Sequence, residues 1–122
     1  MRFTLLDCRF AVALLDPRDP LPPWSEQGPF TSITRTPHEL SIVCAEEHVP
    51  DDVRAEDGWR CLALEGPIAF ETIGVAAEIT RILAARGVSV FVISTFDTDY
   101  VLVKKIDEAI DALLTAGHEV RM

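Results

Sequence analysis

The sequence of 122 residues predicts an α+β protein of two fused lobes, residues 1–61 and 62–122, and the first lobe is expected to have very short helices. Three observations lead to this fold class. Strand and helix patterns alternate regularly through the second half of the chain. A segment of the first half matches a segment of the second half without a gap. All eight prolines lie between Pro17 and Pro67, and proline interrupts helices.

The second lobe begins with a short apolar segment, residues 62–64, which reads as a strand that ends at Gly66-Pro67. A helix is predicted over residues 72–86, because apolar side chains recur there at the i, i+4, i+7 and i+8 spacing of one helix face. Gly87 then ends this helix, as glycine commonly does at that position. The apolar residues of the face are Val75, Ile79, Ile82 and Leu83.

Four further elements complete the second lobe. Residues 88–94 are rich in β-branched side chains and read as a buried strand, and a polar turn leads into a returning strand over residues 100–103. An apolar stripe predicts a helix over residues 105–116, and residues 118–121 can form a last short strand. The order β-α-β-β-α-β is that of the ferredoxin-like fold, in which four antiparallel strands carry both helices on one face.

The first lobe reads as a reduced copy of the same unit. Residues 33–43 align with residues 93–103 at a constant offset of sixty residues, and both end positions are identical. The places of the two helices are taken by residues 16–28, which include four prolines, and by residues 50–57. Because a lobe with so little helix is only marginally stable alone, we expect the two lobes to fold together.

Composition restricts the possible partners. The chain has 11 Lys and Arg against 20 Asp and Glu, which gives a net charge of -9, so a nucleic-acid partner is not expected. No apolar segment reaches the roughly 18 residues of a membrane span. Charged residues interrupt the apolar N-terminus, which reads as a strand rather than a signal peptide, and we expect a cytoplasmic protein without membrane contact. The three cysteines fit neither a disulfide framework nor a zinc site and are expected to be buried, reduced thiols.

The most informative local feature is a polar hairpin, residues 94–99, near the predicted start of the first long helix. One interpretation is a turn whose aspartates cap backbone N–H groups. The other is a binding site, in which the N–H groups of residues 72–75 at the helix start attract a carboxylate. Asp99, with Ser94 and Thr95, would receive an ammonium group. A carboxylate receptor beside an ammonium receptor describes a site for an amino acid.

The hairpin also resembles a known family. Residues 94–103, with Gly66-Pro67 and Gly74-Val75 ahead of them, are similar to the ACT domain. Within that family they resemble the tandem-ACT branch, which is related to aspartate kinase regulatory domains and to cytosolic arginine sensors. The resemblance implies a regulatory fold that binds small ligands, often amino acids, at an interface between ACT units.

The resemblance covers nearly the whole chain, because residues 32–43 and 58–62 are similar to small bacterial stand-alone members of the same branch. The arginine sensors hold an acidic residue where this chain has Thr72, so arginine itself is not implied as the ligand. The residues implied in ligand binding are Thr72, Ile73, Gly74, Val75, Thr95, Phe96 and Asp99, and the polar hairpin adds Ser94.

Other chemistries have weaker support. Asp97 and Asp99 supply too few oxygen ligands for a hard cation, the histidines have no metal-ligand spacing, and no nucleophile elbow is present. We therefore predict no catalytic residue, no metal and no cofactor. The predicted function is non-catalytic regulation through binding of an amino acid or a similar small zwitterion, by a homodimer or larger homo-oligomer. The alternative is a ligand-free protein–protein interaction module with the same fold.

Overall fold

The computed structural model describes residues 1–68 and 73–122 and confirms the α+β class. The chain divides into two compact units. The N-terminal unit consists of residues 7–59, and the C-terminal unit consists of residues 1–6 and 60–122. The lobes predicted from the sequence were residues 1–61 and 62–122, whereas in this division residues 1–6 and 60–61 belong to the C-terminal unit.

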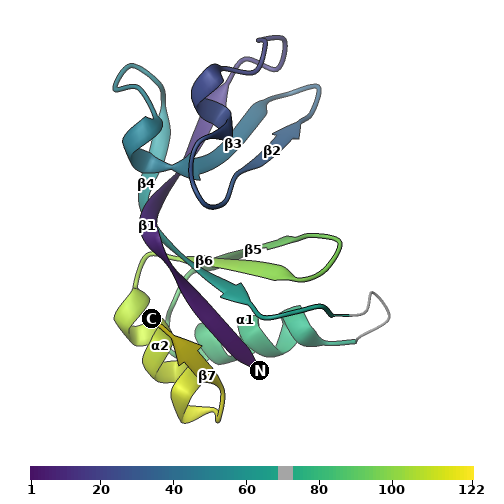
Figure 1. The fold of residues 1–122 in the computed structure, drawn as a ribbon, viewed down its shortest axis with the longest axis vertical. Helices are drawn as coiled ribbons and strands as arrows, with labels where there is room; N and C mark the ends of the chain where they lie inside the picture. Colours follow the sequence, from purple (N-terminus) through teal and green to yellow (C-terminus); the bar gives the residue numbers. More distant parts are fainter. Residues whose placement is uncertain (69–72) are drawn as a thin grey trace. The chain divides into compact units, whose positions relative to one another are not determined.

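The helices and strands follow the predicted order and are labelled in Figure 1. In chain order they are β1 (Arg2–Leu15), η1 (Pro23–Glu26), β2 (Ser32–Arg35), β3 (Leu40–Ala45), η2 (Glu46–His48), β4 (Ala55–Leu64), α1 (Val75–Ala85), β5 (Val90–Ser94), β6 (Asp99–Val103), α2 (Ile106–Thr115) and β7 (Glu119–Arg121). Strands β1 and β4 each contribute residues to both units.

The sheet of the C-terminal unit differs from the expected four antiparallel strands. Strand β6 is antiparallel to β4 and β5, as expected. Residues 2–4 of β1, however, pair in parallel with β7, and β1 neighbours β4 on its other side. The reason is burial: Phe3 is fully buried in the core of this unit, and Leu5 packs against the same core. The N-terminal strand therefore supplies a fifth strand between the last strand of the unit and β4.

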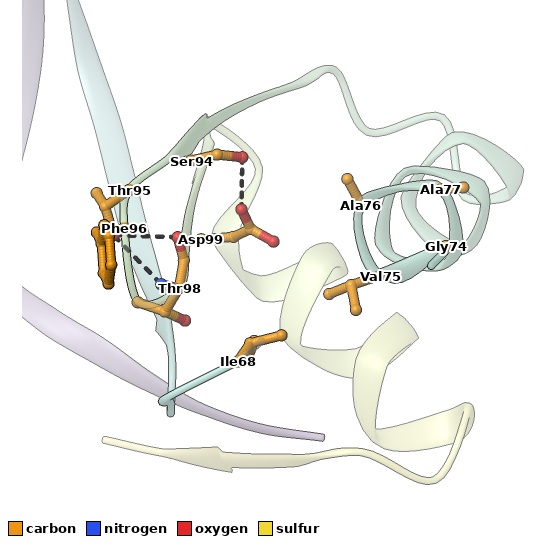
Figure 2. A pocket seen from close by; sticks show the side chains of 10 residues that line it. All are labelled: Ile68, Gly74, Val75, Ala76, Ala77, Ser94, Thr95, Phe96, Thr98 and Asp99. Atoms are coloured by element: carbon orange, nitrogen blue, oxygen red, sulfur yellow. Dashed lines mark hydrogen bonds between the residues drawn. The ribbon is translucent and has the colours of Figure 1, made fainter. Parts of the chain in front are cut away.

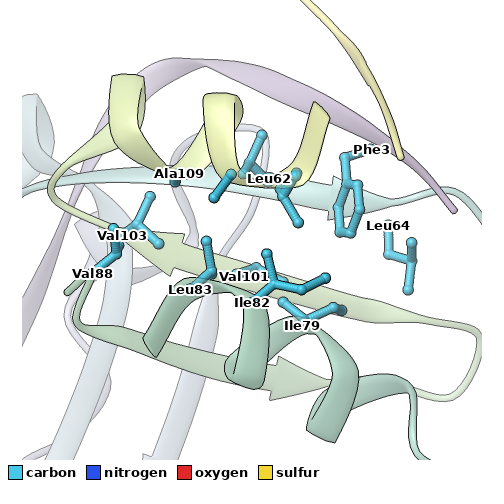
Figure 3. Close-up of a cluster of buried hydrophobic side chains, with 12 residues drawn as sticks. Phe3, Leu62, Leu64, Ile79, Ile82, Leu83, Val88, Val101, Val103 and Ala109 are labelled. Atoms are coloured by element: carbon cyan, nitrogen blue, oxygen red, sulfur yellow. The ribbon is translucent and has the colours of Figure 1, made fainter. Parts of the chain in front are cut away.

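The core of the C-terminal unit lies between the helices and the sheet (Figure 3). Its buried residues are Phe3, Leu62, Leu64, Ile79, Ile82, Leu83, Val88, Val101, Val103, Ala109, Ala112 and Leu113. Helix α1 ends as predicted, because Gly87 adopts a φ of 70° and donates to the carbonyl of Ala84, while the N–H of Val88 donates to the carbonyl of Leu83. Val88 and Leu83 both belong to the core, so the end of the helix is fixed by packing as well.

The N-terminal unit confirms the prediction of very short helices. Between its strands it has only two single-turn 3-10 helices, η1 and η2. Strand β3 pairs antiparallel with β1 on one side and with β2 on the other. The core of this unit consists of Ala13, Leu40, Ile42 and Cys44, with Leu15, Trp24, Val49 and Val53 packed around it.

The hairpins β2–β3 and β5–β6 are equivalent, which supports the internal repeat and corrects its alignment. Arg35 pairs with Leu40, and Ser94 pairs with Asp99, so the equivalent positions lie 59 residues apart (35 and 94, 40 and 99) rather than sixty. A shift of one residue matters in a strand, because it moves every side chain to the opposite face of the sheet.

The two hairpin turns share their hydrogen bonds at this corrected offset. The N–H of Thr36 donates to the carbonyl of Glu39 at 2.9 Å, and the N–H of Thr95 donates to the carbonyl of Thr98 at 2.8 Å. Each threonine hydroxyl also accepts the N–H of the residue three positions later, at 3.1 Å and 3.3 Å. The two halves of the chain therefore contain the same turn, formed by the same residue type.

Candidate ligand-binding site

Six of the eight predicted site residues line one cavity in the C-terminal unit, between the start of α1 and the β5–β6 hairpin (Figure 2). The cavity has a volume of about 350 Å³. The residues that line it are Ile68, Gly74, Val75, Ala76, Ala77, Ser94, Thr95, Phe96, Thr98 and Asp99. Of the residues predicted from the sequence, Ile73 is not among those that line the cavity, and its side chain is 96% exposed. Thr72 lies outside the described residues.

The start of α1 forms one wall of the cavity. The first backbone bond along the helix runs from the N–H of Glu78 to the carbonyl of Gly74, at 2.9 Å. The N–H groups of Val75, Ala76 and Ala77 precede this bond and so have no partner within the helix. Gly74 is the N-cap residue, with a φ of 83°, and it has no side chain to cover these groups. This wall carries the positive end of the helix dipole.

The hairpin forms the opposite wall and carries the negative charge. The hydroxyl of Ser94 donates to Oδ1 of Asp99 at 2.5 Å. The two residues are also a cross-strand pair at the end of β5 and the start of β6. Figure 2 shows the Asp99 carboxylate directed from the hairpin toward α1. Ser94 thus fixes one carboxylate oxygen, while Oδ2 receives no side-chain hydrogen bond from residues 1–68 and 73–122 and faces the cavity side of the hairpin.

Contacts with the last residue of β4 and with the chain that follows it hold the hairpin in this place. The hydroxyl of Thr98 donates to the carbonyl of Leu64 at 2.6 Å, and the N–H of Ile68 donates to the carbonyl of Asp97 at 2.6 Å. At Gly66 a Cβ atom would lie 2.9 Å from the Asp97 carbonyl oxygen and 3.2 Å from the Thr98 Cβ. Only glycine allows this approach without a displacement, and the approach places Ile68 against the cavity.

The other hairpin residues contribute differently from what the sequence predicted. The Thr95 hydroxyl is used within the turn, where it donates to the Thr98 carbonyl at 3.1 Å and accepts the Thr98 N–H at 3.3 Å. Phe96 lines the cavity at its edge, but its side chain is 78% exposed, and Figure 2 shows the ring on the side of the hairpin away from α1. Asp99 and Ser94 therefore supply the polar groups that are best placed for a ligand.

Four residues that line the cavity were not predicted as ligand-binding residues from the sequence: Ile68, Ala76, Ala77 and Thr98. Ile68, Ala76 and Ala77 are apolar or small and carry no chemical signal of their own. Thr98 occupies the position in its hairpin that Glu39 occupies in the hairpin of the N-terminal unit, because the two turns correspond at an offset of 59 residues. Aligning the two halves of the chain at the offset of 59 residues would have identified all of the β5–β6 turn, Thr98 included, as a repeated feature.

The equivalent place in the N-terminal unit has a different chemistry. Leu40 stands at the position of Asp99 and is fully buried in the core. Arg35 stands at the position of Ser94, and its guanidinium donates to the backbone carbonyls of Pro17 and of Asp19. The proline-rich segment is thus tied to the hairpin, and the carboxylate is replaced by a core leucine. The hydrogen-bonded pair of Ser94 and Asp99 in the C-terminal unit thus has no counterpart at the equivalent positions 35 and 40 of the N-terminal unit.

The described residues give little support to metal or thiol chemistry. Residues 1–68 and 73–122 contain no group of three or more His, Cys, Asp or Glu side chains that could hold a metal ion. Cys44 and Cys61 are buried, as predicted, whereas Cys8 is partly exposed, and none of the three forms a disulfide with another described residue. Burial, and to a smaller extent the nearby Cys8, raises the pKa of the Cys44 thiol, which disfavours the reactive thiolate. Within the described part of the chain, no helix is long and apolar enough to cross a membrane.

Comparison with known proteins relates both units to characterised sequence families and solved folds. A family model of the ACT domain matches residues 54–115. A second model, of an N-terminal domain, matches residues 9–52. No curated protein matches the chain.

Several solved structures share the fold. The crystal structure of a protein from Agobacterium tumefaciens has a TM-score of 0.91 and 38% identity, over 98% of this chain and 90% of that one. A protein of unknown function from Vibrio cholerae, described as a possible transport protein, has a TM-score of 0.74 and 21% identity, over 91% and 85%. The ligand-free regulatory subunit of aspartate kinase from Thermus thermophilus has a TM-score of 0.59 and 13% identity, over 92% and 94%. The last two, at such low identity, establish likeness of fold alone.

Proposed function

The chain belongs to the ACT-domain family, and from this premise we propose that it is a non-catalytic regulatory protein that binds a free amino acid or a similar small zwitterion. The proposed site is the cavity between α1 and the β5–β6 hairpin. The residues proposed to bind the ligand are Thr72, Ile73, Gly74, Val75, Ser94, Thr95, Phe96 and Asp99, with Asp99 as the ammonium receptor. The regulatory character is that of ACT domains as a class, and the aspartate kinase subunit that shares the fold is itself a regulatory subunit.

One observation carries the proposal: the two walls of the cavity have opposite polarity. The N–H groups at the start of α1, which have no partner within the helix, favour a carboxylate, while the Asp99 carboxylate, fixed by Ser94 at 2.5 Å, favours an ammonium group. An α-amino acid carries both groups on one carbon atom. A cavity of about 350 Å³ is at the small end of the range of about 300 to 1,000 Å³ that ligand pockets occupy, which fits a ligand of this size.

We further propose that the ligand acts by shifting a population of subunit arrangements in a cytoplasmic homodimer or larger homo-oligomer. An ACT unit of a second copy would complete the site. A ligand that contacts two copies binds the assembled state more tightly than the separate chains, and this difference in affinity is what shifts the equilibrium. The Asp99 position of the N-terminal unit is taken by Leu40, so we expect one ligand for each chain.

Thermal unfolding in the presence of each of the twenty amino acids tests the proposal. A ligand at one hundred times its Kd adds about 2.7 kcal/mol to the free energy of unfolding, which is easily measured. Asp99→Asn is expected to abolish the stabilisation, because asparagine keeps the hydrogen bond from Ser94 but loses the charge. Asp97→Asn is the matched control, since it removes the same charge from the same turn at an exposed position. The proposal fails if no amino acid stabilises the protein, or if both variants respond alike.

The alternative function is a protein–protein interaction module that holds no ligand. Its support is the exposure of two large apolar side chains near the cavity, Ile73 at 96% and Phe96 at 78%. A partner protein would cover them whether or not an amino acid is present. Mass measurement by size-exclusion chromatography with light scattering, with and without added amino acids, separates the two: a hetero-complex that is stable without ligand favours the alternative.

A further inference from the structure

The apolar part of the cavity indicates which amino acids it accepts. Figure 2 shows the side chains of Ile68 and Val75 approaching each other across the floor of the cavity, below the Asp99 carboxylate. Both side chains are partly buried, and both pack at the edge of the core of the C-terminal unit. Ala76 and Ala77 add only methyl groups on the helix side. A ligand whose ammonium group meets Asp99 therefore has an aliphatic surface beside its side chain.

From this arrangement we infer that the site selects α-amino acids with a neutral, aliphatic side chain. The inference rests on the proposed function and adds the chemical class of the ligand. At roughly 30 Å³ for each water-sized group, a cavity of about 350 Å³ accommodates about a dozen such groups, enough for an amino acid the size of leucine or norleucine.

Charge disfavours acidic and basic amino acids. A charged ligand side chain placed against Ile68 and Val75 would lose its hydration without gaining a partner there, which is costly. An acidic side chain would in addition be repelled by Asp99 and by the net charge of -9. A basic side chain would compete with the ligand's own ammonium group for Asp99, of which one oxygen already accepts the Ser94 hydroxyl.

A homologous series of ligands tests the inference by isothermal titration calorimetry: alanine, 2-aminobutyrate, norvaline and norleucine. Each methylene that leaves water for the apolar wall is expected to tighten binding by about fourfold, until the cavity is filled. Lysine and glutamate should bind more weakly than norvaline. If affinity is independent of chain length, or if a charged amino acid binds most tightly, the inference is wrong although the proposed function stands. If no amino acid binds, the proposed function itself has failed.

Two variants test whether the residues that line the cavity cause the selectivity for aliphatic side chains. Val75→Thr keeps the shape but replaces a methyl group with a hydroxyl, so it should weaken norvaline binding severalfold more than it weakens alanine binding. Val90→Thr is the matched control, because Val90 is also half-buried against the same core but does not line the cavity. Ala77→Leu, at an exposed helix position, should exclude norleucine while alanine still binds. Equal loss for short and long ligands in both cavity variants would overturn the inference.

Discussion

At the scale of single residues, the site depends on one glycine that carries no functional group. Gly66 allows the chain after β4 to pass so close to the hairpin that an added Cβ would lie 2.9 Å from a backbone oxygen. This approach is the reason why Ile68 can donate to the carbonyl of Asp97 and line the cavity. The requirement is steric, since Gly66 is not among the glycines with a positive φ.

Gly66→Ala is expected to lower the free energy of unfolding by about 1 to 3 kcal/mol, because the methyl group overpacks a backbone contact that must then move. Because the moving segment is the hairpin that carries Asp99, ligand affinity should fall as well. Urea denaturation measures the first effect and calorimetry the second. Glu65→Ala is a control at the exposed neighbouring position, where the change removes an ion pair with Arg121 and a hydrogen bond from Thr4 but adds no atom to the close approach. A Gly66→Ala protein with unchanged stability would contradict the close approach of the two segments.

At the scale of elements, the N-terminal strand is the largest departure from the ferredoxin-like pattern. Its first residues pair with β7 and neighbour β4 in the C-terminal unit, although they come first in the chain. Phe3 makes an edge-to-face contact with the His118 ring, with ring centroids 6.2 Å apart. The C-terminal unit therefore depends on residues 1–6, which are separated from the rest of the unit by residues 7–59.

Phe3→Ala should destabilise the protein by about 3 to 5 kcal/mol, the usual cost of removing a fully buried phenylalanine. That is a large share of the total stability of about 5 to 15 kcal/mol expected for a domain. Chemical denaturation followed by circular dichroism gives the difference. Phe96→Ala is the control, because a side chain that is 78% exposed loses little burial. Similar losses in the two variants would mean that the β1 segment does not anchor the core.

At the scale of the whole molecule, the stability of the C-terminal unit depends on pH through His118. Burial is the main cause that lowers the pKa of His118. The positive amino group of Met1, which lies 3.0 Å from Nδ1, lowers this pKa further, whereas the negative charge of Glu78 raises it. A histidine in the unfolded chain has a pKa of about 6.5. Below that pH the unfolded chain binds a proton more readily than the folded one, so acid favours unfolding.

The contribution of His118 to the free energy of unfolding should consequently be constant well above about pH 6.5 and decrease as the pH falls below it, by at most about 1.4 kcal/mol for each pH unit. Urea denaturation at about pH 7.5 and about pH 5.5 measures the decrease. His118→Gln should reduce it, whereas His38→Gln, in the exposed turn of the N-terminal unit, should not. Parallel decreases in the native protein and in His118→Gln would rule out His118 as the cause.

The elements, and the polar residues of the candidate site, could be predicted from the amino-acid sequence. The helical spacing of Ile79, Ile82 and Leu83 predicted the buried face of α1, and the prolines predicted a first unit without long helices. Ser94 and Asp99 were identifiable because a carboxylate beside a hydroxyl in a turn is chemically conspicuous. Local patterns of this kind depend on residues that are near in the chain, so they can be read without a structure.

Only the tertiary structure decided the register of the repeat, the place of the N-terminal strand and the apolar floor of the cavity. Identical residues at both ends of the aligned segments favoured an offset of sixty, whereas the pairing of Ser94 with Asp99 requires 59. Phe3, Gly66 and Ile68 acquire their roles through partners that are distant in sequence. Such contacts depend on packing between segments, and an apolar or small residue gives no sign of which segment it will meet.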